Sequence, residues 1–115
     1  MKVLILAAGY ATRLYPRTRN FPKPLLEVHK KPIINYLIEK VERLSGVSKI
    51  VVVTNDRFAR TFEAWAKQLD TRYDIQIVND RTRTPETRLG AVGDMSLVFR
   101  QEAYRGDFLV LGGDN

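Results

Sequence analysis

The chain has 115 residues, of which 44% are hydrophobic and 28% are charged, and this is the composition of one ordinary globular domain. It contains no cysteine, which excludes disulfides, thiolate metal sites and cysteine nucleophiles. The apolar run over residues 3–8 is too short to span a bilayer, which requires about 20 residues, and it also lacks the features of a signal peptide. We therefore expect no membrane segment and a cytoplasmic location.

The net charge of +6 suits two kinds of partner, a nucleic acid or a phosphorylated small molecule. The positions of the basic residues favour the second. They form two clusters in irregular stretches, and neither cluster has the periodicity of a basic recognition helix. The first contains Arg13, Arg17, Arg19 and Lys23, and the second contains Arg81, Arg83 and Arg88. We expect no nucleic-acid partner, while for the second cluster a solvated loop is as good an interpretation as phosphate contact.

The first half of the chain combines short apolar runs with one helical stripe. Lys2–Leu6 suits a strand buried on both faces, and Ala7–Asn20 has no helical period and is predicted to be a long loop. Pro32 is expected to open a helix that ends before Gly46. The apolar stripe of this helix is Ile34, Leu37, Ile38, Val41 and Leu44. Lys49–Thr54 is a second, β-branched strand.

The second half continues the alternation. Asn55 or Asp56 is placed to cap a second helix, whose stripe is Phe58, Phe62, Trp65, Ala66 and Leu69. Asp74–Val78 is a third predicted strand, followed by a polar loop through Arg88. A third helix is indicated by Val92, Met95, Ser96, Phe99 and Ala103, and Phe108–Leu111 is the fourth strand.

Strands and helices thus alternate throughout the chain, which predicts an α/β fold in one domain. Right-handed crossovers build such a chain into a Rossmann-like, three-layer α/β/α sandwich with a mostly parallel sheet. Ligands bind such sheets outside the carboxyl ends of the strands. That edge comprises four loops: Ala7–Lys23, Thr54–Asp56, Asn79–Gly90 and Gly112–Asn115. The two basic clusters and Asp114 therefore fall on one rim, whereas cap or turn roles are expected for Asp56 and Asp80.

The first loop has the small residues that allow a backbone to approach a phosphate. Gly9 permits a positive φ, and Arg13 is able to form a charge-assisted fork to phosphate oxygens. The dinucleotide fingerprint and the Walker lysine motif are both absent. By composition alone, a phosphate loop and a plain strand-to-helix connection are equally good interpretations.

The residues from Leu6 through Val28, LAAGYATRLYPRTRNFPKPLLEV, resemble the signature of the sugar-1-phosphate nucleotidyltransferases, such as glucose-1-phosphate thymidylyltransferases and mannose-1-phosphate guanylyltransferases. The positions that match at the family's spacing are Ala8-Gly9, Thr12-Arg13-Leu14, Pro16, Thr18, Pro22-Lys23-Pro24, Leu25, Lys31-Pro32-Ile33, Leu89-Gly90 and Gly113-Asp114. The resemblance covers essentially the whole chain but only about the first half of a typical member. One departure is Ala11, where a second glycine is common.

The resemblance implies Mg²⁺-dependent transfer from an NTP to a sugar 1-phosphate, which gives an NDP-sugar and pyrophosphate. A phosphate nucleophile, with a second pKa of about 6, is already ionised at neutral pH and needs no general base. Arg13 then neutralises the departing pyrophosphate, Lys23 lies against the reacting phosphates, and Asp114 ligates Mg²⁺. The implied nucleotide-binding residues are Ala8, Gly9, Tyr10, Ala11, Thr12, Leu89 and Gly90.

Residues 1–115 accordingly correspond to the nucleotide-binding half of a nucleotide-diphospho-sugar transferase fold, and the acceptor half is absent from this chain. We expect the isolated chain to be inactive, and the sheet it leaves incomplete favours homo-oligomers. The alternative is a non-catalytic nucleotide- or phosphosugar-binding regulatory module. The nucleobase and the acceptor, a sugar phosphate or another alcohol phosphate such as phosphocholine, stay open.

Overall fold

The computed structural model describes residues 1–9, 20–102 and 107–113, apart from the side chains of residues 91, 101 and 102. The strands are β1 (Lys2–Leu6), β2 (Glu27–Val28), β3 (Lys31–Pro32), β4 (Lys49–Thr54), β5 (Ile75–Asn79) and β6 (Phe108–Gly112). The helices are α1 (Ile33–Glu42), α2 (Ala59–Gln68) and α3 (Gly90–Glu102), with two 3-10 turns, η2 (Lys23–Leu25) and η3 (Pro85–Thr87). Within these described segments, no helix has the length and apolar character needed to cross a membrane.

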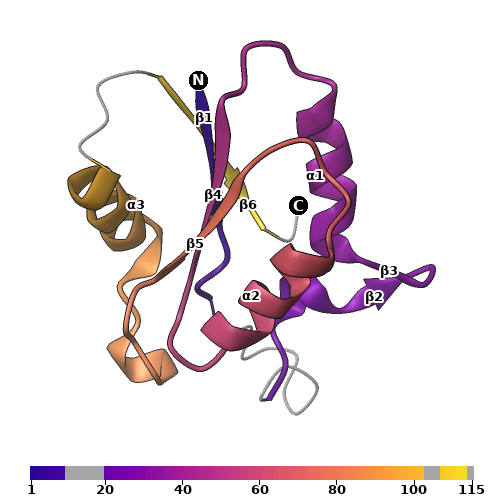
Figure 1. Cartoon of the computed structure of the whole chain (residues 1–115). Helices are drawn as coiled ribbons and strands as arrows, with labels where there is room; N and C mark the ends of the chain where they lie inside the picture. Colours follow the sequence, from indigo (N-terminus) through magenta and orange to yellow (C-terminus); the bar gives the residue numbers. More distant parts are fainter. Residues whose placement is uncertain (10–19, 103–106, 114–115) are drawn as a thin grey trace.

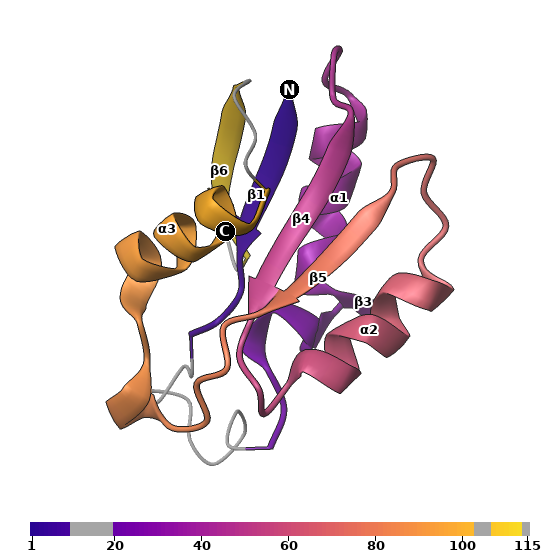
Figure 2. The ribbon, with the colours of Figure 1, turned by 60° about the vertical axis from the view of Figure 1, so that its left-hand side comes forward.

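The predicted parallel sheet is confirmed. Its strand order is β5-β4-β1-β6, and every neighbouring pair is parallel. Leu6 lies opposite Val53 on one side and Gly112 on the other, so the central strands end level with one another. Helices α1 and α2 cover one face and α3 covers the other, which gives the expected three layers (Figures 1 and 2).

The core forms on both faces of β1 and β4. Alternate residues of these strands point to opposite sides, because the side-chain period of a strand is two. Val3 and Ile5 belong to the cluster under α1 and α2, whereas Leu4 belongs to the cluster under α3. All three are fully buried. An apolar strand without alternation is therefore explained by helices on both faces.

Helix α1 ends earlier than its apolar pattern predicted. Pro32 lies at the N-cap instead of inside the helix, because it pairs with Glu27 in the β2–β3 hairpin. The last turn tightens through a bond from the Arg43 amide to the Lys40 carbonyl, and Leu44 beyond it is 38% exposed. Gly46 has a positive φ of 77° in the turn that follows, and does not cap the helix.

The β2–β3 hairpin was not predicted from the sequence. His29 and Lys30 form its turn with φ values of 54° and 64°, a left-handed pair that usually requires Asn and Gly. The Tyr36 hydroxyl donates to the Val28 carbonyl at 2.6 Å and ties the hairpin to α1. Because the usual turn residues are absent, the sequence pattern gives no signal for this hairpin.

The predicted inward face of α3 was wrong in part. Val92 and Phe99 were expected to face the core, but they are 73% and 42% exposed. Asp94 and Val98 are buried instead. A polar residue takes an interior position of this helix because its carboxyl group meets that of Asp80, and apolar periodicity cannot detect such a pairing. The predicted position Ala103 lies outside the described residues.

Candidate functional site

Three segments that are distant in sequence meet where β1 ends. The Gly113 amide donates to the Leu6 carbonyl at 2.9 Å, and this bond brings the end of β6 against the end of β1. A Cβ atom added at Gly113 would lie 3.0 Å from the Leu6 oxygen and 3.3 Å from both Ala7 Cβ and Pro24 Cγ. The third segment is therefore η2, which contains Lys23 and Pro24. The small residues at this point are needed because the backbones approach one another closely.

Lys23 is held in this position by its neighbours. Pro22, Pro24 and Leu25 are buried, whereas Lys23 is half-buried. The prolines fix φ on both sides of the lysine, and the buried neighbours anchor the turn in the core. Because Pro24 contacts Gly113, the lysine segment lies beside the residue that precedes Asp114. The structure thus brings two of the predicted site segments together.

We expect Gly113→Ala to destabilise the fold by about 1–3 kcal/mol, because the added methyl group crowds the Leu6 carbonyl, which cannot move without disturbing β1. Urea unfolding of the purified chain measures the change. Gly9→Ala is a matched control, since a Cβ at Gly9 meets no atom of the described residues within 4 Å. Equal stability of the two variants would show that the end of β6 is not packed as described.

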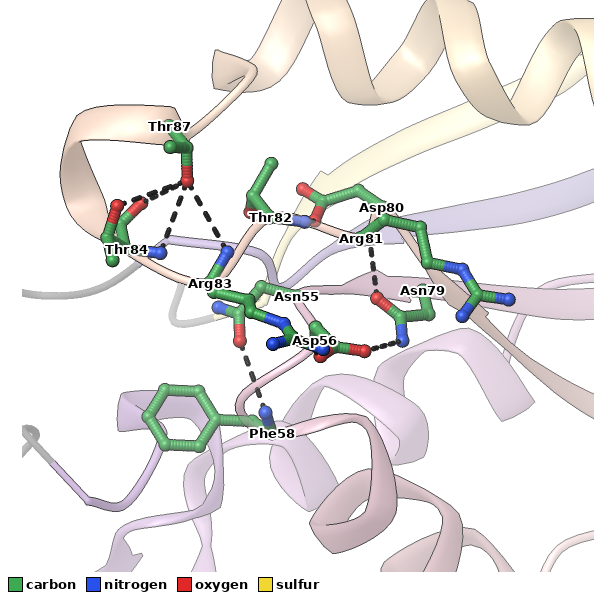
Figure 3. Close-up of polar contacts among 10 residues, drawn as sticks. All are labelled: Asn55, Asp56, Phe58, Asn79, Asp80, Arg81, Thr82, Arg83, Thr84 and Thr87. Carbon is green, nitrogen blue, oxygen red and sulfur yellow. Dashed lines mark hydrogen bonds and ion pairs between the residues drawn. The ribbon is translucent and has the colours of Figure 1, made fainter.

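Asn55 joins the first loop to the start of α2. Its side chain is fully buried, its Nδ2 donates to the Ala8 carbonyl at 3.1 Å, and its Oδ1 accepts the Phe58 amide at 3.1 Å (Figure 3). The second bond stabilises the turn before α2, but the N-cap of α2 is Phe58, which has no side-chain cap bond, so the capping role predicted for Asn55 or Asp56 was wrong. The first bond is a long-range contact that the sequence did not predict. It fixes the direction in which Ala8 and Gly9 leave the sheet.

Asp56 lies in the turn before α2, which agrees with the turn role that was one of the two predicted for it, and its side chain also joins two loops. It accepts hydrogen bonds from Asn79 Nδ2 at 2.8 Å and from Arg83 Nε at 2.9 Å (Figure 3). The hydrogen bond from Asn79 is the largest cause of the lowered pKa of Asp56. Burial acts to raise this pKa, and the Arg83 guanidinium lowers it further. Asp56 therefore binds the loop after β5 to the loop after β4. Arg83, for which a solvated loop and phosphate contact were both open, forms an ion pair within the protein.

Asp80 closes the turn after β5, as predicted. Its Oδ1 accepts the Thr82 amide at 2.9 Å and the Thr82 hydroxyl at 2.8 Å (Figure 3).

Leu89 and Gly90 follow the loop after β5, at the start of α3. Since α3 connects the carboxyl end of β5 with the amino end of β6, its first residues lie on the same edge of the sheet as Gly9 and Gly113. Gly90 has a φ of 76°, whereas Gly9 does not use the positive φ that glycine permits.

Several predicted site residues lie outside the described segments. These are Tyr10, Ala11, Thr12, Arg13 and Asp114. Ala8, Gly9, Lys23, Leu89 and Gly90 are described, and all lie on the carboxyl edge of the sheet or on a segment packed against it. Within the described part of the chain, no group of three His, Asp or Glu side chains is arranged to hold a metal ion.

The fold and this edge are those of the nucleotide-diphospho-sugar transferase class of α/β proteins. A UDP-glucose pyrophosphorylase solved with UDP-glucose superposes with a TM-score of 0.74 at 25% identity, over 98% of this chain and 45% of that one. A CTP:phosphocholine cytidylyltransferase from Streptococcus pneumoniae gives a TM-score of 0.74 at 27% identity, over 98% of this chain and 44% of that one.

The chain belongs to the nucleotidyl transferase family, whose model matches residues 2–115. It is 33% identical over 114 residues to the bifunctional protein GlmU of Methanococcus vannielii, and covers 24% of that protein. It is 34% identical over 117 residues to mannose-1-phosphate guanylyltransferase 1 of Arabidopsis thaliana, and covers 31% of it. Both comparisons include 99% of this chain, which thus spans about a quarter to a third of these relatives' length.

Proposed function

We propose that this chain is the nucleotide-binding half of an enzyme that transfers a nucleotidyl group from an NTP to a sugar 1-phosphate or a similar alcohol phosphate. The products are an NDP-sugar and pyrophosphate. The observation that carries the proposal is the convergence of the β1 end, the Lys23 turn and Gly113 at one edge of the sheet, in a chain of the nucleotidyl transferase family. We place the enzyme in the cytoplasm, where nucleoside triphosphates are abundant.

The chemistry follows from charge and position. An oxygen of the acceptor phosphate attacks the α-phosphorus of the NTP, the bond from that phosphorus to the bridging oxygen breaks, and pyrophosphate leaves with the electron pair. Both reactants are anions, so the largest contribution comes from cations that hold them in line and neutralise their repulsion. Lys23 supplies one such charge, and we assign Arg13 to the departing pyrophosphate. Amides from Gly9 to Thr12 bind the triphosphate.

One carboxylate at this edge of the sheet is proposed to bind Mg²⁺. Asp56 is occupied by Asn79 and Arg83, and Asp80 is buried and turned toward Thr82. We assign Mg²⁺ to Asp114, which follows the glycine packed against η2. Mg²⁺ commonly uses one or two carboxylates together with phosphate oxygens, and when bound it neutralises phosphate charge.

The nucleobase is assigned to the Leu89–Gly90 segment. Leu89 is 46% exposed, and the positive φ of Gly90 turns the backbone at the start of α3. We expect this segment to contact the base through backbone groups, so its side chains do not indicate which base is bound. The relatives are named for different nucleotides, a guanylyltransferase, a CTP-dependent enzyme and a UDP-glucose enzyme among them.

A thermal-shift panel of five NTPs with Mg²⁺, followed by a pyrophosphate-release assay with sugar 1-phosphates, tests this function on the full-length protein. One NTP is expected to stabilise the protein selectively, by about 2.7 kcal/mol at a hundredfold excess over its Kd, and to release pyrophosphate when an acceptor is added. Stabilisation without turnover on any acceptor would support a regulatory nucleotide-binding module instead. No stabilisation by any NTP would refute the proposal.

A further inference from the structure

Two carboxyl groups are buried together beside the segment assigned to the nucleobase. Asp80 follows β5 and is 7% exposed, and Asp94 lies in the second turn of α3 and is 5% exposed. One buried oxygen of each, Asp80 Oδ2 and Asp94 Oδ1, has no hydrogen-bond partner among the described residues, and Asp80 is close enough to raise the pKa of Asp94. The surrounding core on this face of the sheet is apolar, with Val53, Val78 and Val98 in the same cluster. Two acidic groups are therefore placed where water does not neutralise their repulsion.

One oxygen of each carboxyl group lacks a hydrogen-bond donor among the described residues. Thr82 satisfies Asp80 Oδ1, but in the described part of the chain no N–H or O–H group donates to Asp80 Oδ2 or Asp94 Oδ1. Two ionised carboxylates accept hydrogen bonds and cannot donate one to each other. A single shared proton supplies the donor that the pair lacks. Burial raises the pKa of Asp94 to about 8, and the hydrogen bond and charge of Asp80 act in the same direction.

The other charged groups nearby do not replace this proton. Among the described residues, Asp80 is the charged group that acts on the pKa of Asp94. Arg83 is bound to Asp56, and Arg81 extends away from the Asp80 carboxyl group (Figure 3). The apolar residues of β1, β4 and β6 on this face are Leu4, Leu6, Val51, Val53, Phe108 and Val110. Lys2 and Lys49 alternate onto the same face, but they lie at the amino end of the sheet, opposite the end that carries the pair.

The two carboxyl groups lie at the two ends of the loop between β5 and the second turn of α3. Asp80 lies at the point where the chain leaves β5, and Asp94 lies one turn after Gly90. A bond between them therefore closes the loop over residues 81–93 at its two ends. Within the loop, the Thr84–Thr87 turn is stabilised locally, with the Thr84 amide donating to Thr87 Oγ1 at 3.2 Å, but this contact does not reach α3. The carboxyl pair fixes the direction in which α3, and with it the Leu89–Gly90 segment, begins.

We propose that Asp80 and Asp94 share one proton, that this bridge positions the Leu89–Gly90 segment to bind the nucleotide, and that alkaline solution weakens nucleotide binding by removing the proton. The part that concerns nucleotide binding rests on the function proposed above. Asp80 and Asp94 are positioning residues, because they are buried behind the segment and act through it. In the doubly ionised state their repulsion separates the two ends of the loop.

The first test measures the Kd of the selected NTP with Mg²⁺ for the full-length protein between pH 6.5 and 9.5. Because the pKa of Asp94 is about 8, wild-type affinity is expected to fall about tenfold from pH 7 to pH 9. Asp94→Asn retains a donor for Asp80 and has no proton to lose, so its affinity should match that of the wild type at pH 7 and stay level. Asp80→Asn places the donor on the other side and should behave in the same way.

Two further variants separate the bridge from general effects. Asp94→Ala removes the bond without replacing it and should bind several-fold more weakly at every pH. Asp70→Asn removes an exposed carboxylate remote from the pair and should keep the wild-type pH profile. An identical pH profile for wild type and Asp94→Asn would overturn the proposal. Equal affinity of Asp94→Ala and Asp94→Asn at pH 7 would also overturn it, because the bond would then have no positioning effect.

The second test needs no nucleotide. Hydrogen-exchange protection of amides in residues 84–90, corrected for intrinsic exchange, should decline in the wild type as pH rises toward about 8 and level off above it, and should stay constant in Asp94→Asn. The folded protein holds the proton up to about pH 8, whereas the ordinary value is 3.8. The stability that this proton contributes is therefore complete below about pH 4 and is lost as pH rises to about 8. If protection changes as expected but no NTP binds at any pH, the bridge stands and the proposed nucleotide function fails.

Discussion

Replacement of Lys23 by alanine is expected to lower pyrophosphate release by the full-length protein about 10²–10³-fold, the usual cost of losing one preorganised group that stabilises transition-state charge. The turn that holds Lys23 is anchored by its buried neighbours, so the side chain is removed from a position that the rest of the protein keeps fixed. The loss should fall mainly on kcat if the ammonium group acts on charge that develops during phosphoryl transfer. Steady-state kinetics at saturating NTP measures this.

Two control variants show whether the effect is specific to the position and the shape of the Lys23 charge. Lys67→Ala removes a lysine from the exposed face of α2 and should leave turnover unchanged. Lys23→Arg keeps the charge but changes its shape, and intermediate activity is expected because the guanidinium group is planar and larger. Near-normal turnover of Lys23→Ala, with an unchanged melting temperature, would contradict the role assigned to this lysine.

Asn55→Ala is expected to destabilise the chain by about 2–4 kcal/mol, among the larger effects of a single substitution. The change removes the donor to the buried Ala8 carbonyl and leaves the Phe58 amide with its longer bond of 3.3 Å to the Asn55 backbone carbonyl, since both lost bonds come from this one fully buried side chain. It also frees the end of β1 from α2, so NTP binding should weaken in the same variant. Equilibrium unfolding in urea gives the free energy.

Two other substitutions separate the contributions of the two Asn55 hydrogen bonds to stability from the effect of an exposed asparagine. Asn55→Asp keeps the acceptor for the Phe58 amide but places a carboxylate against the Ala8 carbonyl, so it should destabilise at neutral pH despite its similar size. Asn20→Ala, at an exposed position, should change stability by less than about 0.5 kcal/mol. If Asn55→Ala were as stable as Asn20→Ala, the buried bond to Ala8 would not organise the first loop.

The sequence was sufficient to predict the sheet because its strands are continuous apolar runs. Lys2–Leu6 and Lys49–Thr54 were predicted with their observed bounds. β5 both begins and ends one residue later than predicted, and β6 ends one residue later. The ends of strands depend on individual hydrogen bonds, such as the one from Gly113 to Leu6, which a hydrophobic pattern does not contain. The edge that carries the candidate site followed from the alternation of strands and helices along the chain, because ligands bind parallel sheets at the carboxyl ends of their strands.

Long-range polar contacts could not be predicted in the same way. The bond from Asn55 to Ala8 joins positions whose proximity exists only after β1 and β4 pair. Asp94 is buried beside Asp80, whereas an acidic residue in a helix is usually expected to face water. In each case the residue type is uninformative until its partner is known. The roles of Arg13 and Asp114 stay predictions, since both residues lie outside the described segments.

An amide NMR titration of the chain with the selected NTP and Mg²⁺ tests the central claim most directly, because it reports on every segment of the carboxyl edge at once. The largest shifts are expected at the amides of Gly9, Gly90 and Gly113, which come from three different loops of this edge. Shifts that left these three glycines unchanged and appeared instead on the outer faces of α1 and α2 would contradict the account.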